Sequence, residues 1–400
     1  MRKIILFLLC FTALYSQSQK YDKLALTPPM GWNSWNTFAC DINEDLIKQT
    51  ADLMITTGMR DAGYEYVNLD DCWHGMRDSL GFIHPDPKRF PSGMKALADY
   101  VHSRGLKIGI YSDAGWNTCG GKPGSRGYEY QDALTYAQWG IDYLKYDWCN
   151  TDSLLAVEAY KTMRNALASA KHPVIFSICE WGDHKPWLWG KNIGHLWRTT
   201  GDIFPSWNGE MGHGSWVSNG IMQILDMQKD LRQYAGPGHW NDPDMMEVGN
   251  GMNVHEDRAH FSLWCMLAAP LIAGNDLRSM SKETTEILTN EDVIAVNQDS
   301  LGVQCFKWFK FNDLEIYAKP LANNELAICF LNRGESVKKI NFDWKTSENI
   351  SDSFSGTNYN FINDTYKIRD LWAHKEVGNT SKPFSAELGP HDVFMLRLKK

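Results

Sequence analysis

Short apolar runs recur along the first three quarters of the chain, and nearly all of them end on an acidic residue. Seven such runs are YEYVNLDD (64–71), LKIGIYSD (106–113), DYLKYD (142–147), VIFSICE (174–180), LWRTTGD (196–202), HWNDPD (239–244) and PLIAGND (270–276). A further short run, PPMGW (28–32), precedes them. Runs of this length and composition are typical of buried strands. The pattern therefore predicts eight strands.

Helical patterns fill most of the intervals between these runs. The ranges that place apolar residues on one helical face are 43–59, 92–105, 128–140 and 153–170, whereas 184–195 predicts only a short helix or an irregular loop. Strands that alternate with helices favour a parallel sheet. Eight βα units predict a (β/α)8 TIM barrel of the α/β class, in which all the acidic strand ends meet at one face.

The pattern changes after about residue 303. Short segments, several with alternating apolar and polar residues, are separated by turn-forming pairs such as Asn323-Asn324 and Arg333-Gly334. They predict a C-terminal antiparallel β-sandwich. We therefore expect three parts: a signal peptide at 1–18, a catalytic barrel at 24–303 and a C-terminal antiparallel β domain at 304–400.

The first residues have the features of a secretory signal. Arg2 and Lys3 precede an apolar run, Ile4 to Tyr15, that is too short to span a bilayer. A lipid anchor at Cys10 is disfavoured because Leu9 is bulky where a small residue is needed. We expect export to the periplasm or the cell exterior, with no membrane span.

An exported chain should pair some of its cysteines. Cys40 and Cys72 follow the first two strands, and Cys119 and Cys149 follow the third and fourth. Because neighbouring loops at one barrel face can approach within bridging distance, we expect the disulfides Cys40–Cys72 and Cys119–Cys149. The remaining cysteines lie inside apolar runs, which favours buried free thiols; they are Cys179, Cys265, Cys305 and Cys329.

Charge and motifs exclude several kinds of protein. The net charge of -8 and the lack of any Lys/Arg-rich tract argue against a nucleic-acid partner. In HEDRAH (255–260) the two histidines would lie about 140° apart on a helix, so zinc binding is disfavoured. The chain has no phosphate-binding loop, no nucleophile elbow and no CxxC pair. We expect neither a metal nor a cofactor.

Two of the acidic strand ends suggest the chemistry of the site. Lys145 and Asp147 share one face of a strand, so we expect Lys145 to hold the pKa of Asp147 low, as a nucleophile requires; the alternative is a structural ion pair. Asp202 would lie two strands away, and two carboxylates across a pit are sufficient for glycoside hydrolysis. Because Arg198 would lower the pKa of a general acid, we expect Arg198 to point toward Asp147 or the substrate instead of Asp202.

Other residues at the strand ends would line the same pit. Asp70 and Asp71 mark a strand exit and both could reach a ligand, although either could instead cap a helix. Asp244 is a further acid at the mouth. With 17 Trp and 16 Tyr, the chain also offers stacking surfaces for a sugar; the tryptophans at strand ends are Trp32, Trp35, Trp73, Trp148 and Trp181.

From about residue 26 to the C-terminus, the chain resembles the melibiase-type α-galactosidases, glycoside hydrolase family 27. The motifs that carry the resemblance fall in order on seven strand ends: PPMGWNSWNTF (28–38), YVNLDDCW (66–73), FPSGMKALADYVHSRGLKIGIYSDAG (90–115), YLKYDWCN (143–150), CEWG (179–182), WRTTGDI (197–203) and GHWNDPDMMEVGN (238–250). The resemblance implies a retaining exo-α-galactosidase without a cofactor. It further implies Asp147 as the nucleophile and Asp202 as the acid/base, and it supports both disulfides.

The resemblance also implies how galactose would be bound. It assigns Asp70 and Asp71 to the 4- and 6-hydroxyls, Lys145 to the edge with the 3- and 4-hydroxyls, and Glu180 with Arg198 to the 2-hydroxyl. We expect Trp181 to form a wall of the pit beside Glu180. The residues that would complete the pocket are Trp35, Tyr111, Cys119, Asp244 and Met245.

The sequence leaves a few alternatives open. An α-N-acetylgalactosaminidase or a β-L-arabinopyranosidase could use the same fold, and so could an inactive sugar-binding protein, although the presence of both carboxylates weighs against the last. Bulky Trp148 directly after Asp147 departs from the family pattern and would shape the aglycone side. The expected substrate is an α-galactoside oligosaccharide or polysaccharide, and no oligomeric state is predicted.

Overall fold

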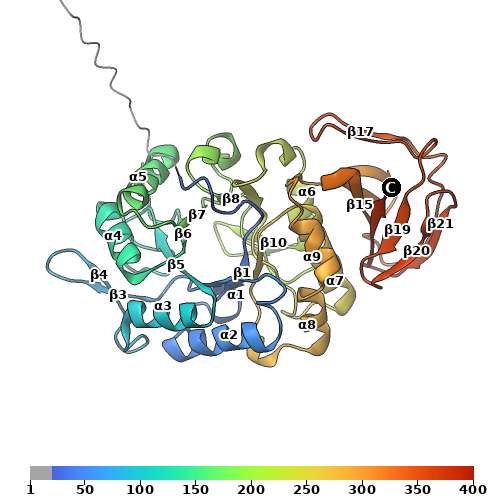
Figure 1. Cartoon of the computed structure of the whole chain (residues 1–400). Helices are drawn as coiled ribbons and strands as arrows, with labels where there is room; N and C mark the ends of the chain where they lie inside the picture. The colour runs from blue at the N-terminus through green and yellow to red at the C-terminus, as the bar shows by residue number, and fades with distance from the viewer. Residues whose placement is uncertain (1–19) are drawn as a thin grey trace, which may run out of the picture.

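A ring of parallel strands forms the first part of the protein, which we describe from a computed structural model covering residues 20–400. Neighbouring strands pair in the order β11-β8-β7-β6-β5-β2-β1-β12 (Figure 1). All eight predicted strands are confirmed: β1 (Met30–Asn33), β2 (Tyr66–Asn68), β5 (Lys107–Asp113), β6 (Tyr143–Asp147), β7 (Ile175–Ile178), β8 (Leu196–Arg198), β11 (Trp240–Asp242) and β12 (Leu271–Ala273). The predicted signal peptide and Cys10 lie outside the described residues.

The two ends of this sheet meet just beyond β11. Met246 forms a parallel bridge with Ala273 of β12. The backbone N–H of Met246 donates to the carbonyl of Ile272 at 2.8 Å, and the N–H of Gly274 donates back to the carbonyl of Met246 at 3.2 Å. These bonds close the barrel, and they fix the segment after β11 against the carboxyl end of β12.

Helices surround the ring, and the four helices predicted from the sequence are confirmed as α2 (Glu44–Thr56), α3 (Gly93–Ser103), α4 (Glu129–Trp139) and α5 (Ala156–Ser169). The segment 184–195 forms only two short 3-10 turns, as expected. The other helices are α1 (Trp35–Phe38), α6 (Ile221–Met227), α7 (Val254–Met266), α8 (Lys282–Leu288) and α9 (Glu291–Asn297). Within residues 20–400 no helix has the length and apolar character needed to cross a membrane.

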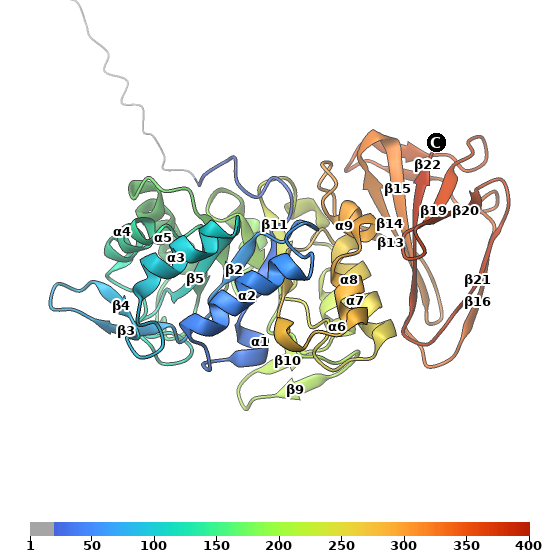
Figure 2. The ribbon, with the colours of Figure 1, turned by 60° about the horizontal axis from the view of Figure 1, so that its bottom comes forward.

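Two hairpins, neither of them predicted, extend from the loops that follow β2 and β8. The first pairs β3 (His74–Arg77) with β4 (Ile83–Pro85), and the second pairs β9 (Glu210–Gly212) with β10 (Val217–Asn219). Figure 2 shows the β9–β10 hairpin at the same end of the barrel as α1, the end where the strands have their carboxyl termini.

The C-terminal part is an antiparallel β-sandwich, as predicted. One sheet has the order β13-β14-β15-β22-β19-β20, and the pairs β16–β21 and β17–β18 lie against it. Its strands are β13 (Phe306–Phe311), β14 (Leu314–Leu321), β15 (Glu325–Asn332), β16 (Lys338–Phe342), β17 (Ile350–Asp352), β18 (Thr357–Tyr359), β19 (Lys367–Asp370), β20 (Lys375–Asn379), β21 (Phe384–Leu388) and β22 (Val393–Lys399).

The central strands of the sandwich bury both of their faces. On β15, Leu326, Ile328 and Phe330 belong to the core of the sandwich, whereas Cys329 and Leu331 belong to the core that continues into the barrel. Side chains alternate along a strand, so one sheet can serve two cores. The barrel and the sandwich therefore share a continuous apolar interface, in which helix α7 packs against β14, β15 and β22.

A buried lysine lies in this interface. Lys319 of β14 is 1% exposed, and its Nζ donates to the carbonyl of Cys265 in α7 at 2.9 Å. Burial lowers the pKa of Lys319 to about 8. Among residues 20–400 no carboxylate forms an ion pair with Lys319, and the more distant charge of Asp299 does not offset the desolvation of its ammonium group. Such a group destabilises the protein.

We predict that Lys319→Met raises the free energy of unfolding at pH 7 by roughly 1–3 kcal/mol. In the unmodified protein the lowered pKa of Lys319 costs stability below pH 8, and this cost disappears as the pH rises toward 10.5, where the unfolded lysine also loses its proton. The advantage of the variant should therefore shrink between pH 7 and pH 10, as measured by urea unfolding. Lys282→Met, at an exposed lysine, serves as the control; a variant less stable than the parent at pH 7 would contradict this account.

Candidate active site

The acidic strand ends converge at the carboxyl end of the barrel. Strands β5 and β6 are in register there, so that Tyr111 lies beside Lys145 and Asp113 beside Asp147. Asp202 follows β8 after a short turn, and its negative charge contributes to the raised pKa of Asp147. The two carboxylates that the sequence singled out therefore lie close enough to interact through their charges.

The carboxyl group of Asp147 is buried, with the residue 5% exposed, and its Oδ1 accepts a hydrogen bond from the backbone N–H of Trp148 at 3.0 Å. Burial raises the pKa of Asp147 to about 6, and the positive charge of Lys145 opposes this shift. The expectation that Lys145 would hold the pKa of Asp147 low is therefore wrong, because desolvation outweighs the cation. The carboxyl group is still mainly ionised at pH 7.

Lys145 makes its direct contact with another acid. Its Nζ lies 2.8 Å from Oδ2 of Asp70, and the same oxygen accepts from Nδ2 of Asn33 at 2.8 Å. The ammonium group also lies over the ring of Tyr111, 5.3 Å from its centre. Lys145, Asp70 and Tyr111, three of the predicted sugar-binding residues, thus form one contiguous group.

Asp71 fixes a neighbouring loop. Its Oδ2 accepts from the backbone N–H of Gly120 at 2.6 Å, and its Oδ1 accepts from the N–H of Cys72 at 2.6 Å. Burial raises the pKa of Asp71. Its contacts tie the end of β2 to the loop after β5, and neither Asp71 nor Asp70 caps a helix.

Both predicted disulfides are confirmed: Cys40–Cys72, with Cα atoms 5.1 Å apart, and Cys119–Cys149, with Cα atoms 5.2 Å apart. The four remaining cysteines among residues 20–400 are buried free thiols, also as predicted. The hydroxyl of Tyr111 donates to Sγ of Cys119 at 3.4 Å, which places this disulfide beside the group around Lys145.

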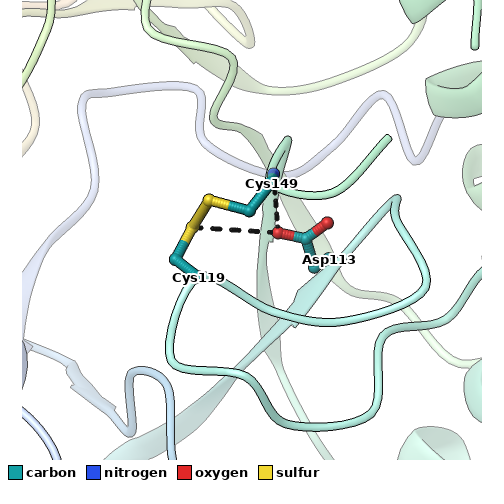
Figure 3. A group of neighbouring side chains, drawn as sticks. All are labelled: Asp113, Cys119 and Cys149. Carbon is teal, nitrogen blue, oxygen red and sulfur yellow. Dashed lines mark hydrogen bonds between the residues drawn. A yellow bond between two sulfur atoms is a disulfide. The ribbon is translucent and has the colours of Figure 1, made fainter. Parts of the chain in front are cut away.

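Asp113 lies beside the second disulfide (Figure 3). Its Oδ2 accepts from the backbone N–H of Cys149 at 2.9 Å and lies 3.9 Å from Sγ of Cys119, while its Oδ1 accepts from the N–H of Gly115 at 2.7 Å. Asp113, Cys119 and Cys149 lie as close together as the ligands of a metal ion. Because the two sulfurs are bonded to each other, they carry no thiolate charge, and the cluster does not fit a metal.

Arg198 joins Asp202 to Asp244. Its Nη2 lies 3.0 Å from Oδ1 of Asp202 and 2.8 Å from Oδ2 of Asp244. The expectation that Arg198 would turn away from Asp202 is therefore wrong. Arg198 is 3% exposed, so its guanidinium group needs anionic partners, and these two carboxylates follow β8 and the neighbouring strand β11. Within the described residues, Nε of Arg198 is buried without a hydrogen-bond partner.

Glu180 is fully buried after β7. Its Oε2 accepts from the backbone N–H of His184 at 2.6 Å and faces Nδ1 of the same histidine at 2.8 Å. Its Oε1 has no partner among the described residues, and burial raises the pKa of Glu180 to about 7.

Trp148, directly after Asp147, packs its ring between those of Tyr160 and His184.

The remaining predicted residues also lie near the strand ends, but their contacts with a sugar stay predictions. Trp35 is half-buried at the start of α1, and its backbone N–H donates to Oδ1 of Asn33 at 2.8 Å. Met245 is buried, and its N–H donates to Oδ1 of Asp244 at 2.8 Å. Trp181 is half-buried with a φ of 57°, which lies in the left-handed region.

Several positioning residues were missed from the sequence. Asn33 donates a hydrogen bond to Asp70. Its position directly after the first predicted strand could have indicated that it lies at the mouth of the barrel. Asp113 also stood at a predicted strand end, without an assigned role. His184 and Gly120 lie in irregular loops, where no periodicity relates them to the acids that they contact.

Comparisons with known proteins show which family the chain resembles. Residues 27–299 match the family model "Alpha galactosidase A", and residues 311–398 match "Alpha galactosidase C-terminal beta sandwich domain". Alpha-galactosidase A of Cellvibrio japonicus is 57% identical over 386 residues, which cover 96% of this chain and 95% of that protein. The crystal structure of alpha-galactosidase I from Mortierella vinacea has 38% identity and a TM-score of 0.87, covering 94% of this chain and 98% of that one.

A solved structure with a sugar bound is also similar. Alpha-galactosidase from Saccharomyces cerevisiae with raffinose has 30% identity and a TM-score of 0.88, and the match covers 96% of this chain and 99% of that chain.

We predict that the carboxyl group of Asp147 titrates near pH 6, measured by 13C NMR of protein labelled at the aspartate side-chain carbons and assigned with Asp147→Asn. Lys145→Met should raise this pKa further, because the ammonium group opposes the effect of burial. Asp202→Asn should lower it, because it removes a like charge. A titration near pH 4 that neither substitution moves would show that the carboxyl group is solvated.

Proposed function

This chain belongs to the alpha-galactosidase A family, and from this premise we propose that it is a retaining exo-α-galactosidase that removes terminal α-galactosyl residues from oligosaccharides or polysaccharides. The pairing of buried Asp147 with Asp202 at the carboxyl end of the barrel is the observation that carries the mechanism. A nucleophile and an acid/base are the two groups that retaining hydrolysis requires.

In the proposed first step, Asp147 attacks the anomeric carbon of galactose. A bond forms between its carboxylate oxygen and that carbon, the glycosidic C–O bond breaks, and the proton of Asp202 passes to the departing oxygen. In the second step water attacks the same carbon, gives a proton to Asp202 and releases Asp147. Two inversions return α-galactose. The pKa of Asp147, about 6, supports this role because the group is mainly ionised at neutral pH.

Two unpartnered atoms support the assignment of the 2-hydroxyl. Oε1 of Glu180 is a buried acceptor and Nε of Arg198 is a buried donor, and both lack partners among the described residues. A hydroxyl both donates and accepts, so one sugar hydroxyl could serve the two atoms. Leaving such groups unpaired costs about 1–3 kcal/mol each, and a substrate that pairs them recovers part of this cost.

The other hydroxyls would meet the group around Lys145. The contact of Lys145 with Asp70 supports the proposed site for the 3- and 4-hydroxyls, because it presents a donor and an acceptor side by side. Asp71 would accept from the 6-hydroxyl. Trp35, Tyr111, Cys119, Asp244 and Met245 would complete the pocket, and Trp181 would form a wall beside Glu180.

Three alternatives can be separated by simple assays. An α-N-acetylgalactosaminidase or a β-L-arabinopyranosidase would prefer the corresponding chromogenic glycoside, and an inactive sugar-binding protein would cleave none. A β-L-arabinopyranosidase from Geobacillus stearothermophilus shares this fold at 24% identity, which bears on the fold alone. We propose export to the periplasm or the cell exterior, and the two disulfides are consistent with an extracellular protein.

We predict different effects from the two catalytic aspartates. Asp147→Ala should abolish turnover of every galactoside, because no covalent intermediate can form. Asp202→Ala should spare the first step for substrates with very acidic leaving groups, which need little protonation. The difference is measured by comparing the stopped-flow rate of dinitrophenol release from a dinitrophenyl galactoside with the rate of galactose release from melibiose. NMR of the reaction of the parent enzyme should detect α-galactose as the first product. β-Galactose appearing first, or equal losses on both substrates for Asp202→Ala, would contradict the assignment.

We predict a strong preference for α-galactosides over α-N-acetylgalactosaminides. An N-acetyl group at the 2-position would clash with the buried carboxylate of Glu180 and leave its Oε1 without a hydrogen-bond partner, so the ratio of kcat/KM should exceed roughly a hundredfold. Glu180→Ser should narrow this ratio by opening space beside the 2-position, and Asp183→Ala, at an exposed acid nearby, should not. Similar kcat/KM values on the two sugars in the unmodified enzyme would overturn the role of Glu180.

A further inference from the structure

The β9–β10 hairpin presents exposed apolar side chains directly after Asp202. Met211 is 41% exposed, Trp216 49% and Val217 43%. Single exposed apolar residues are common on protein surfaces. Met211 pairs with Ser218 and Val217 pairs with Gly212, so Met211 and Val217 point to opposite faces of the hairpin and do not form one patch with each other. Figure 2 places this hairpin at the end of the barrel where the acidic residues meet.

The root of the hairpin is the peptide of Asp202 itself. The backbone N–H of Asn219, the last residue of β10, donates to the carbonyl of Asp202 at 2.7 Å, and the N–H of Phe204 donates to the carbonyl of Asn219 at 3.1 Å. The N–H of Ile203 donates to Oδ2 of Asp244 at 2.9 Å. The hairpin is therefore anchored at the acid/base, and its position relative to that residue is fixed by backbone hydrogen bonds.

The tip of the hairpin is ordered around an aromatic pair. The rings of His213 and Trp216 stack with centroids 4.0 Å apart and an interplanar angle of 18°. The N–H of His213 donates to the carbonyl of Trp216 at 2.8 Å, and Nε2 of His213 lies 2.9 Å from Oγ of Ser218. Gly214, with a φ of 85°, allows the tight turn between the two rings. One face of Trp216 is thereby supported, and the residue remains half exposed.

A supported, exposed indole ring suits one kind of ligand in particular. The C–H groups on one face of a pyranose ring form a flat apolar patch, while its hydroxyls point outward into water. Such a patch can stack on an indole without desolvating the hydroxyls. Because the turn holds the ring in place, little side-chain entropy is lost on binding.

We propose that the β9–β10 hairpin is a binding arm for the sugar chain that carries the terminal galactose, and that Trp216 stacks on a sugar ring of this chain. The inference rests on the proposed function, because it assigns the arm to the leaving-group side of Asp202. Trp216 lies three residues from Asn219, a span of about 10 Å along an extended strand. On this proposal the arm contacts sugars beyond the one next to the scissile bond, and it favours branched polysaccharides over short galactosides.

Kinetics on substrates of increasing length test the arm. We compare methyl α-galactoside, raffinose and galactomannan, a mannose backbone with α-galactosyl branches. Trp216→Ala should lower the ratio of kcat/KM on galactomannan to that on methyl α-galactoside by roughly three- to tenfold, as expected for one lost aromatic contact. Trp216→Phe should keep most of the ratio and Trp216→Leu should not, because stacking needs a flat ring.

The control is Phe311→Ala, at an exposed aromatic residue of the sandwich, which should leave the ratio unchanged. Circular dichroism establishes that each variant is folded. Retardation in a gel containing galactomannan, with Asp147→Ala in both proteins to prevent turnover, measures binding, and Trp216→Ala should be retarded less than the protein that keeps Trp216. Equal ratios of kcat/KM and equal gel retardation with and without Trp216 would contradict the proposed role of the hairpin. If the unmodified enzyme cleaves none of the three substrates, the proposed function is refuted. The retardation in the galactomannan gel would still test whether the hairpin binds the sugar chain.

Discussion

Two buried cations make it possible for the barrel to gather so many carboxylates at one end. Lys145 contacts Asp70, and Arg198 contacts Asp202 and Asp244. Bringing several carboxylates together in a poorly solvated pit costs both desolvation and mutual repulsion. The two cations reduce the repulsion without removing it, because the pKa of Asp147 still rises to about 6. The electrostatics of the whole site follow from this balance.

The strand register of the parallel barrel also determines where the acidic side chains lie. Register between β5 and β6 puts Asp113 next to Asp147, and closure through Met246 fixes the segment after Asp244 against β12. A shift of one residue in either register would turn the acidic side chains away from the mouth. The disulfide Cys119–Cys149 joins the loops that follow β5 and β6, and Asp113 accepts a hydrogen bond from the backbone N–H of Cys149.

The strands and both disulfides could be predicted because each depends on local patterns: apolar runs that end on an acid, and cysteines just past neighbouring strands. The direction of Arg198 and the pKa of Asp147 could not, because each depends on which charges are buried together once the loops are placed. The β9–β10 hairpin was missed for another reason. Its strands have only three residues each and are mostly exposed, so they carry no hydrophobic period.

The division of labour between strands and loops follows from these differences. Asp147 ends a barrel strand and is buried among neighbours that fix its charge, whereas Asp202 lies on a loop with its side chain 38% exposed. In the proposed mechanism Asp202 exchanges protons with a leaving group and with water and needs such access, whereas Asp147, as the nucleophile, does not. Because the carbonyl of Asp202 also anchors the β9–β10 hairpin, the proposed acid/base and the hairpin beyond it form one structural unit. In the proposed function, the part of the site that meets variable substrates is built on a loop, while the part that performs the invariant chemistry is built on the barrel.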